Sequence, residues 1–198
     1  MNVVLIDYGA GNVRSVIFAL RRLGIEAKLS GDSAEIIAAD KIIFPGVGEA
    51  SSAMQVMKDR QLDLLIPQLK QPVLGICLGM QLLCRHSEEG NTNGLNVFPA
   101  QVKRFMPESK DAFQKVPHMG WNALGDVQGK LFEGISADAS VYFVHSYYAE
   151  LISDTTATSD YNTTFSAALC RDNFYAVQFH PEKSGKTGER ILENFLKL

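Results

Sequence analysis

Val73-Leu74-Gly75-Ile76-Cys77-Leu78-Gly79-Met80-Gln81 is the stretch that decides the fold of this 198-residue chain. It starts as a short apolar run, typical of a buried strand, and continues from Leu78 with the spacing of a helix. Cys77 lies at the junction, with Gly75 and Gly79 two residues away on either side. A side chain at a sharp strand-to-helix turn projects above the edge of a sheet, and hydrolases use the same spacing with serine at the centre. Cys77 is therefore a candidate nucleophile on an α/β sheet.

Two interpretations of Cys77 are open at this point. Unpaired cysteines are among the most buried residues, and most of them are inert small hydrophobes. The helix that follows Cys77 would instead point its unpaired N–H groups and positive dipole end at the sulfur, which favours the nucleophilic thiolate. The choice depends on whether the chain also supplies a base and a group that orients the base.

The bulk composition fits one globular domain over residues 1–198. Hydrophobic residues make up 46% and charged residues 21%, and a chain of this length buries a sizeable core. The net charge of −3 gives no basic surface for nucleic acid. No uncharged apolar run approaches the roughly 18 residues of a membrane helix, and the N-terminus reaches Asp7 too soon for a signal peptide. Three cysteines without paired spacing favour a reducing compartment, so we expect a cytoplasmic protein.

The N-terminal half alternates apolar runs with helical patterns, which predicts βαβ units and a parallel sheet with right-handed crossovers. Gly9-Ala10-Gly11 lacks the third glycine of a dinucleotide fingerprint, because Arg14 occupies its place. Asn12 is the expected N-cap of the first helix. The expected strands are 3–7, 25–29, 41–44 and 73–76, and the expected helices are 12–23, 50–57, 62–69 and 78–86. A short polar stretch at 33–38 precedes the third strand.

The C-terminal half changes character after a polar loop at 88–94. Short alternating segments with turn residues between them are typical of antiparallel strands. We expect strands at 95–105, 141–148, 166–170 and 175–179, and a closing helix at 187–198. The fold prediction is an α/β single domain with an open, mostly parallel sheet flanked by helices and added antiparallel strands in the C-terminal half.

Pro45-Gly46-Val47-Gly48-Glu49 follows the third predicted strand. Open α/β sheets place their sites at the carboxyl ends of parallel strands. One interpretation is a simple turn into the next helix. The other is that backbone N–H groups of the loop face the nucleophile and form half of an oxyanion hole, since glycines allow a peptide to change its orientation.

His180 is the strongest candidate for the base among four histidines. It ends a strand and is followed by Pro181-Glu182, where proline fixes the turn. His180 and Glu182 can then converge as a base and its orienting carboxylate. A metal site would need further ligands at recognisable spacing, and none is evident, so we expect neither metal nor cofactor. His118 and His145 fit core histidines, His86 fits a solvated or C-capping one, and spacing alone leaves a structural role open for His180.

The motifs at 75–81 and 180–182 together resemble those of the class I (triad) glutamine amidotransferases, and the resemblance covers the full chain. It implies a flavodoxin-like fold and a catalytic triad of Cys77, His180 and Glu182. It also implies glutamine as substrate. Further implied positions are the oxyanion-hole residues Leu78, Val47 and Gly48, and the substrate contacts Gly48, Gln81, Ser146 and Tyr147.

Three further segments narrow the resemblance within that family: 7–12, 116–122 and 183–184. They are similar to those of the glutaminase subunits of imidazole glycerol phosphate synthases, which act in histidine biosynthesis. This implies an allosteric heterodimer with a (β/α)8-barrel cyclase subunit that receives ammonia through a tunnel. Interface and gating candidates are Tyr142, Lys183, Met119 and Trp121.

Several alternatives are weighed against this assignment. One is a glutaminase serving another synthase, such as the anthranilate or pyridoxal phosphate enzymes, although the motif at 116–122 argues against it. A docking subunit without activity is a second, and a cysteine peptidase or thiol hydrolase is a third. Cys84 and Cys170 lie in apolar patterns, so we expect structural roles for both.

Overall fold

The computed structural model describes residues 1–9, 13–106 and 115–198. Within these ranges, one large sheet runs through the molecule in the order β2-β1-β3-β4-β13-β12-β10-β7-β5-β6, with β11 alongside β12. A second sheet consists of β8 and β9. The strands are β1 Val3–Ile6, β2 Lys28–Ser30, β3 Lys41–Gly46, β4 Val73–Cys77, β5 Cys84–Ser87, β6 Thr92–Asn93, β7 Phe98–Arg104, β8 His118–Ala123, β9 Ser140–His145, β10 Tyr147–Ala149, β11 Thr155–Tyr161, β12 Thr163–Arg171 and β13 Phe174–Val177.

The first part of the large sheet is parallel, as the sequence predicts. Strands β2, β1, β3, β4 and β13 are paired in parallel, whereas β12 pairs antiparallel with β13, and β10 antiparallel with both β12 and β7. The prediction of an α/β fold with added antiparallel strands in the C-terminal half is therefore confirmed. Strand β4 lies between β3 and β13, so the end of β4 is at the centre of the sheet.

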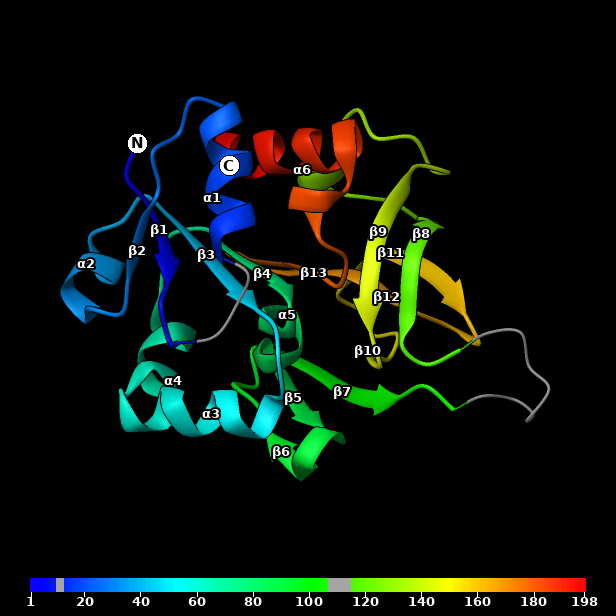
Figure 1. Cartoon of the computed structure of the whole chain (residues 1–198), viewed down its shortest axis with the longest axis horizontal. Coiled ribbons are helices and arrows are strands. Elements are labelled where there is room, and N and C mark those ends of the chain that lie inside the picture. The colour runs from blue at the N-terminus through cyan, green and yellow to red at the C-terminus, as the bar shows by residue number, and fades with distance from the viewer. Residues whose placement is uncertain (10–12, 107–114) are drawn as a thin grey trace.

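Helices cover both faces of the parallel strands. In Figure 1, α1 and α6 lie on one side of the sheet, and α3 and α4 lie on the other. Val4 and Ile6 of β1 belong to the core on the α3 side, and Val3 and Leu5 belong to the core on the α1 and α6 side. Burial on both faces explains why these strands are continuous apolar runs. The helices are α1 Val13–Arg22, α2 Ser33–Ile37, α3 Ala50–Asp59, α4 Leu62–Leu65, α5 Leu78–Leu83 and α6 Gly185–Lys197, with short 3-10 turns at η1 Ile66–Gln68, η2 Glu89–Asn91, η3 Lys130–Phe132 and η4 Pro181–Lys183.

The β8–β9 pair forms a separate small sheet beside α6, over the antiparallel strands (Figure 1). Phe143 of β9 is fully buried, and its ring centroid lies 5.7 Å from that of Phe165 and 5.8 Å from that of Phe179. This aromatic contact joins the small sheet to β12 and to the segment that leads into η4. The small sheet therefore shares the core on the α1 and α6 side.

Two predicted elements are wrong. The helix expected to reach His86 ends at Leu83, because the backbone N–H groups of 95–97 donate to the carbonyls of Leu82, Leu83 and Cys84 at 2.8–3.1 Å. Cys84 then starts β5, which pairs in parallel with β7. The strand expected at 141–148 is two strands, β9 and β10, in different sheets.

Other expectations fall short in smaller ways. Helix α2 and strands β5, β6, β8 and β11 were not predicted, and the strand expected at 95–105 begins at Phe98. The strand expected at 41–44 continues as β3 through Pro45 to Gly46, where the sequence predicts a loop. The proposed Asn12 N-cap and part of the glycine motif at 9–11 lie outside the described residues. Among the residues that are described, none belongs to a helix with the length and hydrophobicity needed to span a bilayer.

Candidate active site

Cys77 occupies a strained turn at the end of β4. Its φ of 54° and ψ of −109° are rare for a residue with a side chain. The pairing of β4 with β3 and β13 on its two sides, up to the Gly46–Cys77 partners, holds this geometry. Gly79 allows the following helix to approach β3, since a Cβ at Gly79 would lie 1.9 Å from the Phe44 carbonyl oxygen. The surrounding sheet therefore enforces the strained backbone that places the buried Cys77 side chain at the cavity.

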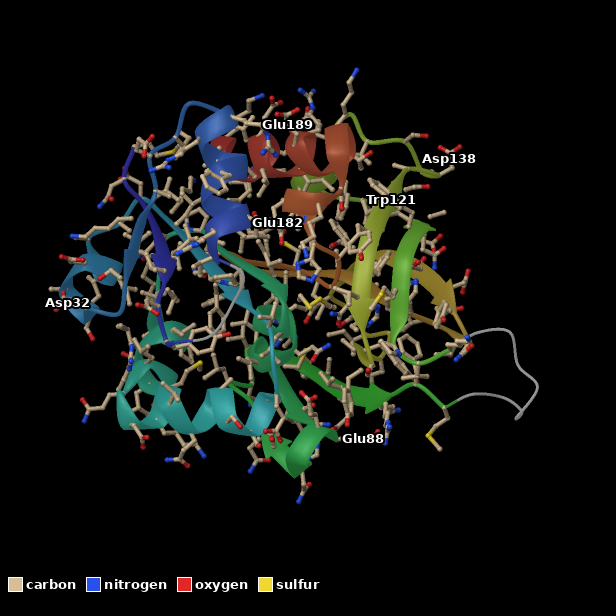
Figure 2. All side chains as sticks on the ribbon, in the orientation of Figure 1. Asp32, Glu88, Trp121, Asp138, Glu182 and Glu189 are labelled. Carbon is tan, nitrogen blue, oxygen red and sulfur yellow. The ribbon has the colours of Figure 1, made fainter. Side chains whose placement is uncertain are left out.

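His180 reaches the same place from the neighbouring strand. The chain leaves β13, and the His180 N–H donates to the Tyr142 carbonyl of β9 at 2.9 Å. Pro181 starts the 3-10 turn η4, which brings Glu182 back toward the imidazole. His180 Nδ1 lies 2.8 Å from Glu182 Oε1, and the two side chains are only 3% and 1% exposed. Figure 2 shows Glu182 in the interior, whereas the labelled Asp32, Glu88 and Asp138 lie at the periphery.

The charge state of His180 follows from its neighbours. Burial lowers the pKa of His180, but the nearby Cys77 sulfur and the Glu182 carboxylate outweigh burial, so the pKa is raised above its ordinary value. Nε2 makes no hydrogen bond of ordinary geometry to any described residue, although the sulfur is close enough to act on the ring. An imidazolium beside a sulfur is the charge arrangement that favours a thiolate.

The site is open to ligands through a cavity of about 350 Å³. Cys77 and His180 line it together with all the residues for which the sequence implies substrate or oxyanion contacts. Glu182 lies outside the lining, behind His180, as an orienting group would. The lining residues are Val47, Gly48, Cys77, Leu78, Gln81, Glu89, Pro117, Val144, His145, Ser146, Tyr147 and His180.

Gln81 offers the cavity an acceptor. Its Nε2 donates to the Tyr147 carbonyl at 2.9 Å and to Gln178 Oε1 at 2.9 Å. An amide nitrogen has two protons, so both are used inside the protein. Oε1 is the Gln81 atom that remains for a ligand, and it can accept a hydrogen bond from an ammonium or amide group.

Glu89 also lines the cavity, and it was not predicted because 88–94 has the composition of a polar loop. Glu89 Oε2 accepts the Ala50 N–H at 2.8 Å, which fixes the carboxylate at the start of α3. Burial raises the pKa of this carboxyl, with a smaller contribution from nearby Glu49. A fixed acidic group in a cavity is a candidate partner for a cationic ligand.

The four interface candidates gather on the outer side of the β8–β9 pair and η4. Met119 and Trp121 are 62% and 58% exposed. Trp121 pairs with Tyr142 across the strands, and their ring centroids are 6.2 Å apart. The Lys183 ammonium lies 5.8 Å from the centroid of the Tyr142 ring. Figure 2 shows Trp121 beside the β8 and β9 ribbons. None of the four lines the cavity, but Tyr142 contacts His180 through the backbone.

The other cysteines and histidines have structural surroundings. Cys84 is fully buried, and burial raises the pKa of its thiol. Burial likewise raises the pKa of the half-buried Cys170. His86 lies on β5, with Nε2 2.9 Å from Asn91 Oδ1. Within the described ranges, no group of three or more His, Cys, Asp or Glu residues is arranged to hold a metal ion.

Comparison with known sequences gives a consistent result. The model of the family "Glutamine amidotransferase class-I" matches residues 4–198. The chain is 58% identical to the imidazole glycerol phosphate synthase subunit HisH of Bacteroides thetaiotaomicron, over all of both chains. It is 48% identical over 202 residues to the HisH subunit of Photorhabdus laumondii, again with both chains covered in full. The HisH subunit of Haemophilus influenzae strain Rd is 46% identical, with 100% of this chain and 98% of that one covered.

Comparison with solved structures supports the fold. A crystal structure described as a glutamine amidotransferase superposes with a TM-score of 0.75 at 22% identity, covering 99% of this chain and 98% of that one. A structure described as PurLQS from Thermotoga maritima gives a TM-score of 0.74 at 17% identity, covering 99% and 97%. At these identities, the likeness is evidence for the α/β architecture alone.

Proposed function

This chain belongs to the class-I glutamine amidotransferase family, and we propose that it is the glutaminase subunit of an imidazole glycerol phosphate synthase. It hydrolyses glutamine and supplies the ammonia to a synthase partner. The full-length identity to HisH subunits supports the choice of synthase. The observation that carries the chemistry is the buried His180–Glu182 pair, since His180 shares one cavity wall with Cys77.

Each member of the proposed triad has a distinct task. Cys77 is the nucleophile, and the family typically uses a cysteine in this role. His180 is the general acid and base, and its raised pKa supplies a proton where the amide leaves. Glu182 holds the imidazole through Nδ1 at 2.8 Å and favours its charged form.

The reaction takes place in two halves. The sulfur of Cys77 attacks the side-chain amide carbon of glutamine, so that a C–S bond forms while the C–N bond breaks. His180 gives its proton to the leaving nitrogen, and ammonia departs from a glutamyl thioester. His180 then takes a proton from water, whose oxygen attacks the thioester carbon and releases glutamate and the Cys77 thiolate, while the proton remains on His180.

The oxyanion that forms in each half needs two N–H donors. The N–H of Leu78 belongs to the first residue of α5 and has no partner within the helix. The second donor comes from Val47 or Gly48, which line the same cavity. Removing one such donor typically costs about 10²–10³ in turnover.

Glutamine is held by its α-ammonium and α-carboxylate groups. Gln81 Oε1 and the fixed Glu89 carboxylate are acceptors suited to the ammonium. Ser146 and Tyr147 also line the cavity and offer hydroxyl donors, and Gly48 completes the backbone contacts. The volume of about 350 Å³ suits a single amino acid.

The partner in this proposal is a cyclase subunit with a (β/α)8 barrel, forming a cytoplasmic heterodimer. The surface of Met119, Trp121, Tyr142 and Lys183 is the proposed docking face. It combines exposed apolar side chains with one cation, and its Tyr142 accepts a hydrogen bond from the His180 N–H. Ammonia released beside His180 would cross this face without entering bulk water. No phosphate site or cofactor is required in this chain, since ring formation belongs to the partner.

The test is ammonia and glutamate release from glutamine, measured with and without the cyclase. Hydrolysis that increases when the cyclase is added supports the proposal. Cys77→Ala should lose the glutamine-dependent reaction, while the complex still forms product from added ammonium. Stimulation by an anthranilate or pyridoxal phosphate synthase instead of the cyclase would favour the alternative glutaminase roles, and peptide cleavage would favour a thiol peptidase.

A further inference from the structure

Gln178 is a fully buried polar residue that the mechanism has not yet used. It follows β13, two residues before His180, and its side chain is 0% exposed. Its Oε1 accepts from Gln81 Nε2 at 2.9 Å, and its Nε2 donates to Cys77 Sγ at 3.7 Å. A buried amide between a substrate-pocket residue and the candidate nucleophile requires a physical explanation, because burial without full pairing is costly.

The orientation of the Gln178 amide is determined by the backbone. The Tyr147 carbonyl can only accept, so the Gln81 atom that faces it must be the amide nitrogen. The same nitrogen faces Gln178, and the Gln178 atom on that side must therefore be its oxygen. This leaves the Gln178 NH₂ group directed at the sulfur.

A pair of buried histidines fixes the far end of the same network. His145 Nδ1 lies 2.7 Å from the Tyr147 carbonyl, so this nitrogen carries the proton. His145 Nε2 is then an acceptor, and His118 Nδ1, 3.0 Å away, donates to it. The Tyr147 carbonyl oxygen thus accepts hydrogen bonds from both His145 Nδ1 and Gln81 Nε2, which together fix its position.

The Cys77 sulfur has two polar neighbours, one of which favours the thiol and the other the thiolate. Val144 O lies 3.9 Å from Cys77 Sγ and can accept a proton from the thiol, but it repels a thiolate. The Gln178 N–H donates to the sulfur, and a donor stabilises the charged form over the neutral one. The two contacts approach the sulfur from different segments, β9 and the chain after β13.

We propose that Gln178 is a further catalytic residue, whose side-chain N–H stabilises the Cys77 thiolate and aims it at the substrate carbon. The proposal rests on the proposed role of Cys77 as the nucleophile. The same donor assists the second half of the reaction, where the thiolate is the leaving group of the thioester. Gln81, the Tyr147 carbonyl and the His118–His145 pair act on the sulfur through Gln178, as positioning groups.

The test measures the rate at which Cys77 is alkylated by iodoacetamide, using peptide mass spectrometry, in the complex of full-length chain and cyclase. Gln178→Met keeps the volume but has no donor at any pH. Gln178→Glu has a proton to donate only while the new carboxyl is protonated. Gln71→Met is the matched control, because Gln71 also donates from a partly buried amide to a carbonyl, that of Ile36 at 2.8 Å, but precedes β4 at the end away from Cys77.

We expect Gln178→Met to slow the alkylation of Cys77 by about tenfold at neutral pH, the effect of losing one hydrogen bond to a charged group. Gln178→Glu should be close to the parent protein at low pH, with a deficit that grows as pH rises. Gln71→Met should change nothing, and labelling of Cys170 in the same samples should stay constant. Turnover at saturating glutamine should fall in parallel with the alkylation rate, with little change in KM.

Two results would overturn the proposal. One is parent-like alkylation in Gln178→Met, and the other is an equal deficit at every pH in both variants, which a merely structural role predicts. Gln178→Glu decides alone if Gln178→Met does not fold. Failure of the parent complex to hydrolyse glutamine would refute the proposed function but not the role of Gln178, because alkylation reports on the thiolate itself.

Discussion

The Cys77 turn and the Val47–Gly48 loop that follows β3 meet at one cavity, yet they are built in opposite ways. Cys77 has a strained backbone that two neighbouring strands and the Gly79 contact enforce. Val47 and Gly48 are exposed, and Gly48 has a φ of +110° with nothing within 4 Å of where a Cβ would lie. The backbone is strained at the proposed nucleophile, and open space surrounds the proposed second oxyanion donor.

The difference predicts unequal halves of the oxyanion hole. The N–H of Leu78 is fixed by the start of α5, and Gly46 is held in β3 opposite Cys77. The peptide between Val47 and Gly48 can instead turn either its N–H or its C=O toward the cavity, because Gly48 tolerates a wide range of backbone angles and has open space around it. A carbonyl in that position would repel the developing negative charge. A partner that binds more tightly to the productive orientation would then raise turnover by shifting the population of the loop.

The largest effect on glutamine turnover should come from His180→Asn, beside the fixed Cys77 turn. This change removes the proton carrier, and we expect glutamine turnover to fall by about 10⁴ or more. Glu182→Gln keeps a hydrogen-bonding shape but loses the charge, so its loss should be smaller. Steady-state ammonia release from the two variants in complex with the cyclase measures both. A loss for Glu182→Gln equal to that of His180→Asn would contradict its role as an orienting group.

Alanine substitution of Gly79, next to the Cys77 turn, and of Gly48, in the loop, compares the two regions directly. Gly79→Ala places a methyl group against the Phe44 carbonyl, so the free energy of unfolding should fall by about 3 kcal/mol or more. Gly48→Ala meets no neighbour and suffers only backbone strain of about 1–2 kcal/mol. Its turnover should nevertheless drop by about tenfold to a hundredfold, because the loop peptide is no longer free to present its donor.

Chemical denaturation of both variants, together with turnover in complex, provides the measurement. If Gly48→Ala were the less stable of the two variants, the contrast between an enforced turn and an open loop would be wrong. Unchanged turnover in a folded Gly48→Ala protein would remove the loop from the oxyanion hole.

A smaller effect concerns the buried His118–His145 pair, which contacts the Tyr147 carbonyl and should destabilise the fold when the pH is lowered. Burial lowers the pKa of His118 to about 4 and that of His145 to about 3. Between these values and the ordinary value of about 6.5, the unfolded chain binds more protons than the folded chain. The free energy of unfolding should therefore fall as pH is lowered from 7 to 5, by roughly 1–2 kcal/mol for each histidine.

Urea denaturation at pH 7 and pH 5 gives this difference, and His118→Phe is the variant to compare. Phenylalanine keeps a ring in the stack between Phe143 and Tyr161 but does not titrate. Its loss of stability on acidification should be smaller than that of the parent protein. An equal loss in both proteins would place the acid sensitivity elsewhere.

The sequence was informative where a local rule imposes the geometry. The glycines around Cys77 predicted a strand-to-helix turn, and Pro181 after His180 predicted the close return of Glu182. In both places the backbone is constrained by neighbours in sequence, and the structure has Cys77 and His180 at the ends of adjacent strands with the His180–Glu182 distance at 2.8 Å. The parallel order of the first strands followed equally from their continuous apolar runs.

The features that were missed depend on distant segments. Helix α5 ends early because the backbone N–H groups of 95–97 donate to the carbonyls at its C-terminal end. The sequence around Leu83 contains no signal of that contact. The split of β9 from β10 and the pairing of β9 with β8 likewise depend on partners far away in the chain. Gln178 could have been noticed from the sequence, because it is a polar residue in an otherwise apolar strand end. Glu89 could not, because its loop has the composition of an ordinary solvated turn.

Turnover at saturating glutamine, compared among the free chain, the complex, and the complex with a cyclase ligand bound, tests the central claim most directly. The unequal oxyanion hole predicts a slow free chain, a faster complex, and the fastest rate with the ligand present, with an increase of about 10²–10³ overall if one donor is gained. A free chain that turns over glutamine as fast as the liganded complex would contradict the account.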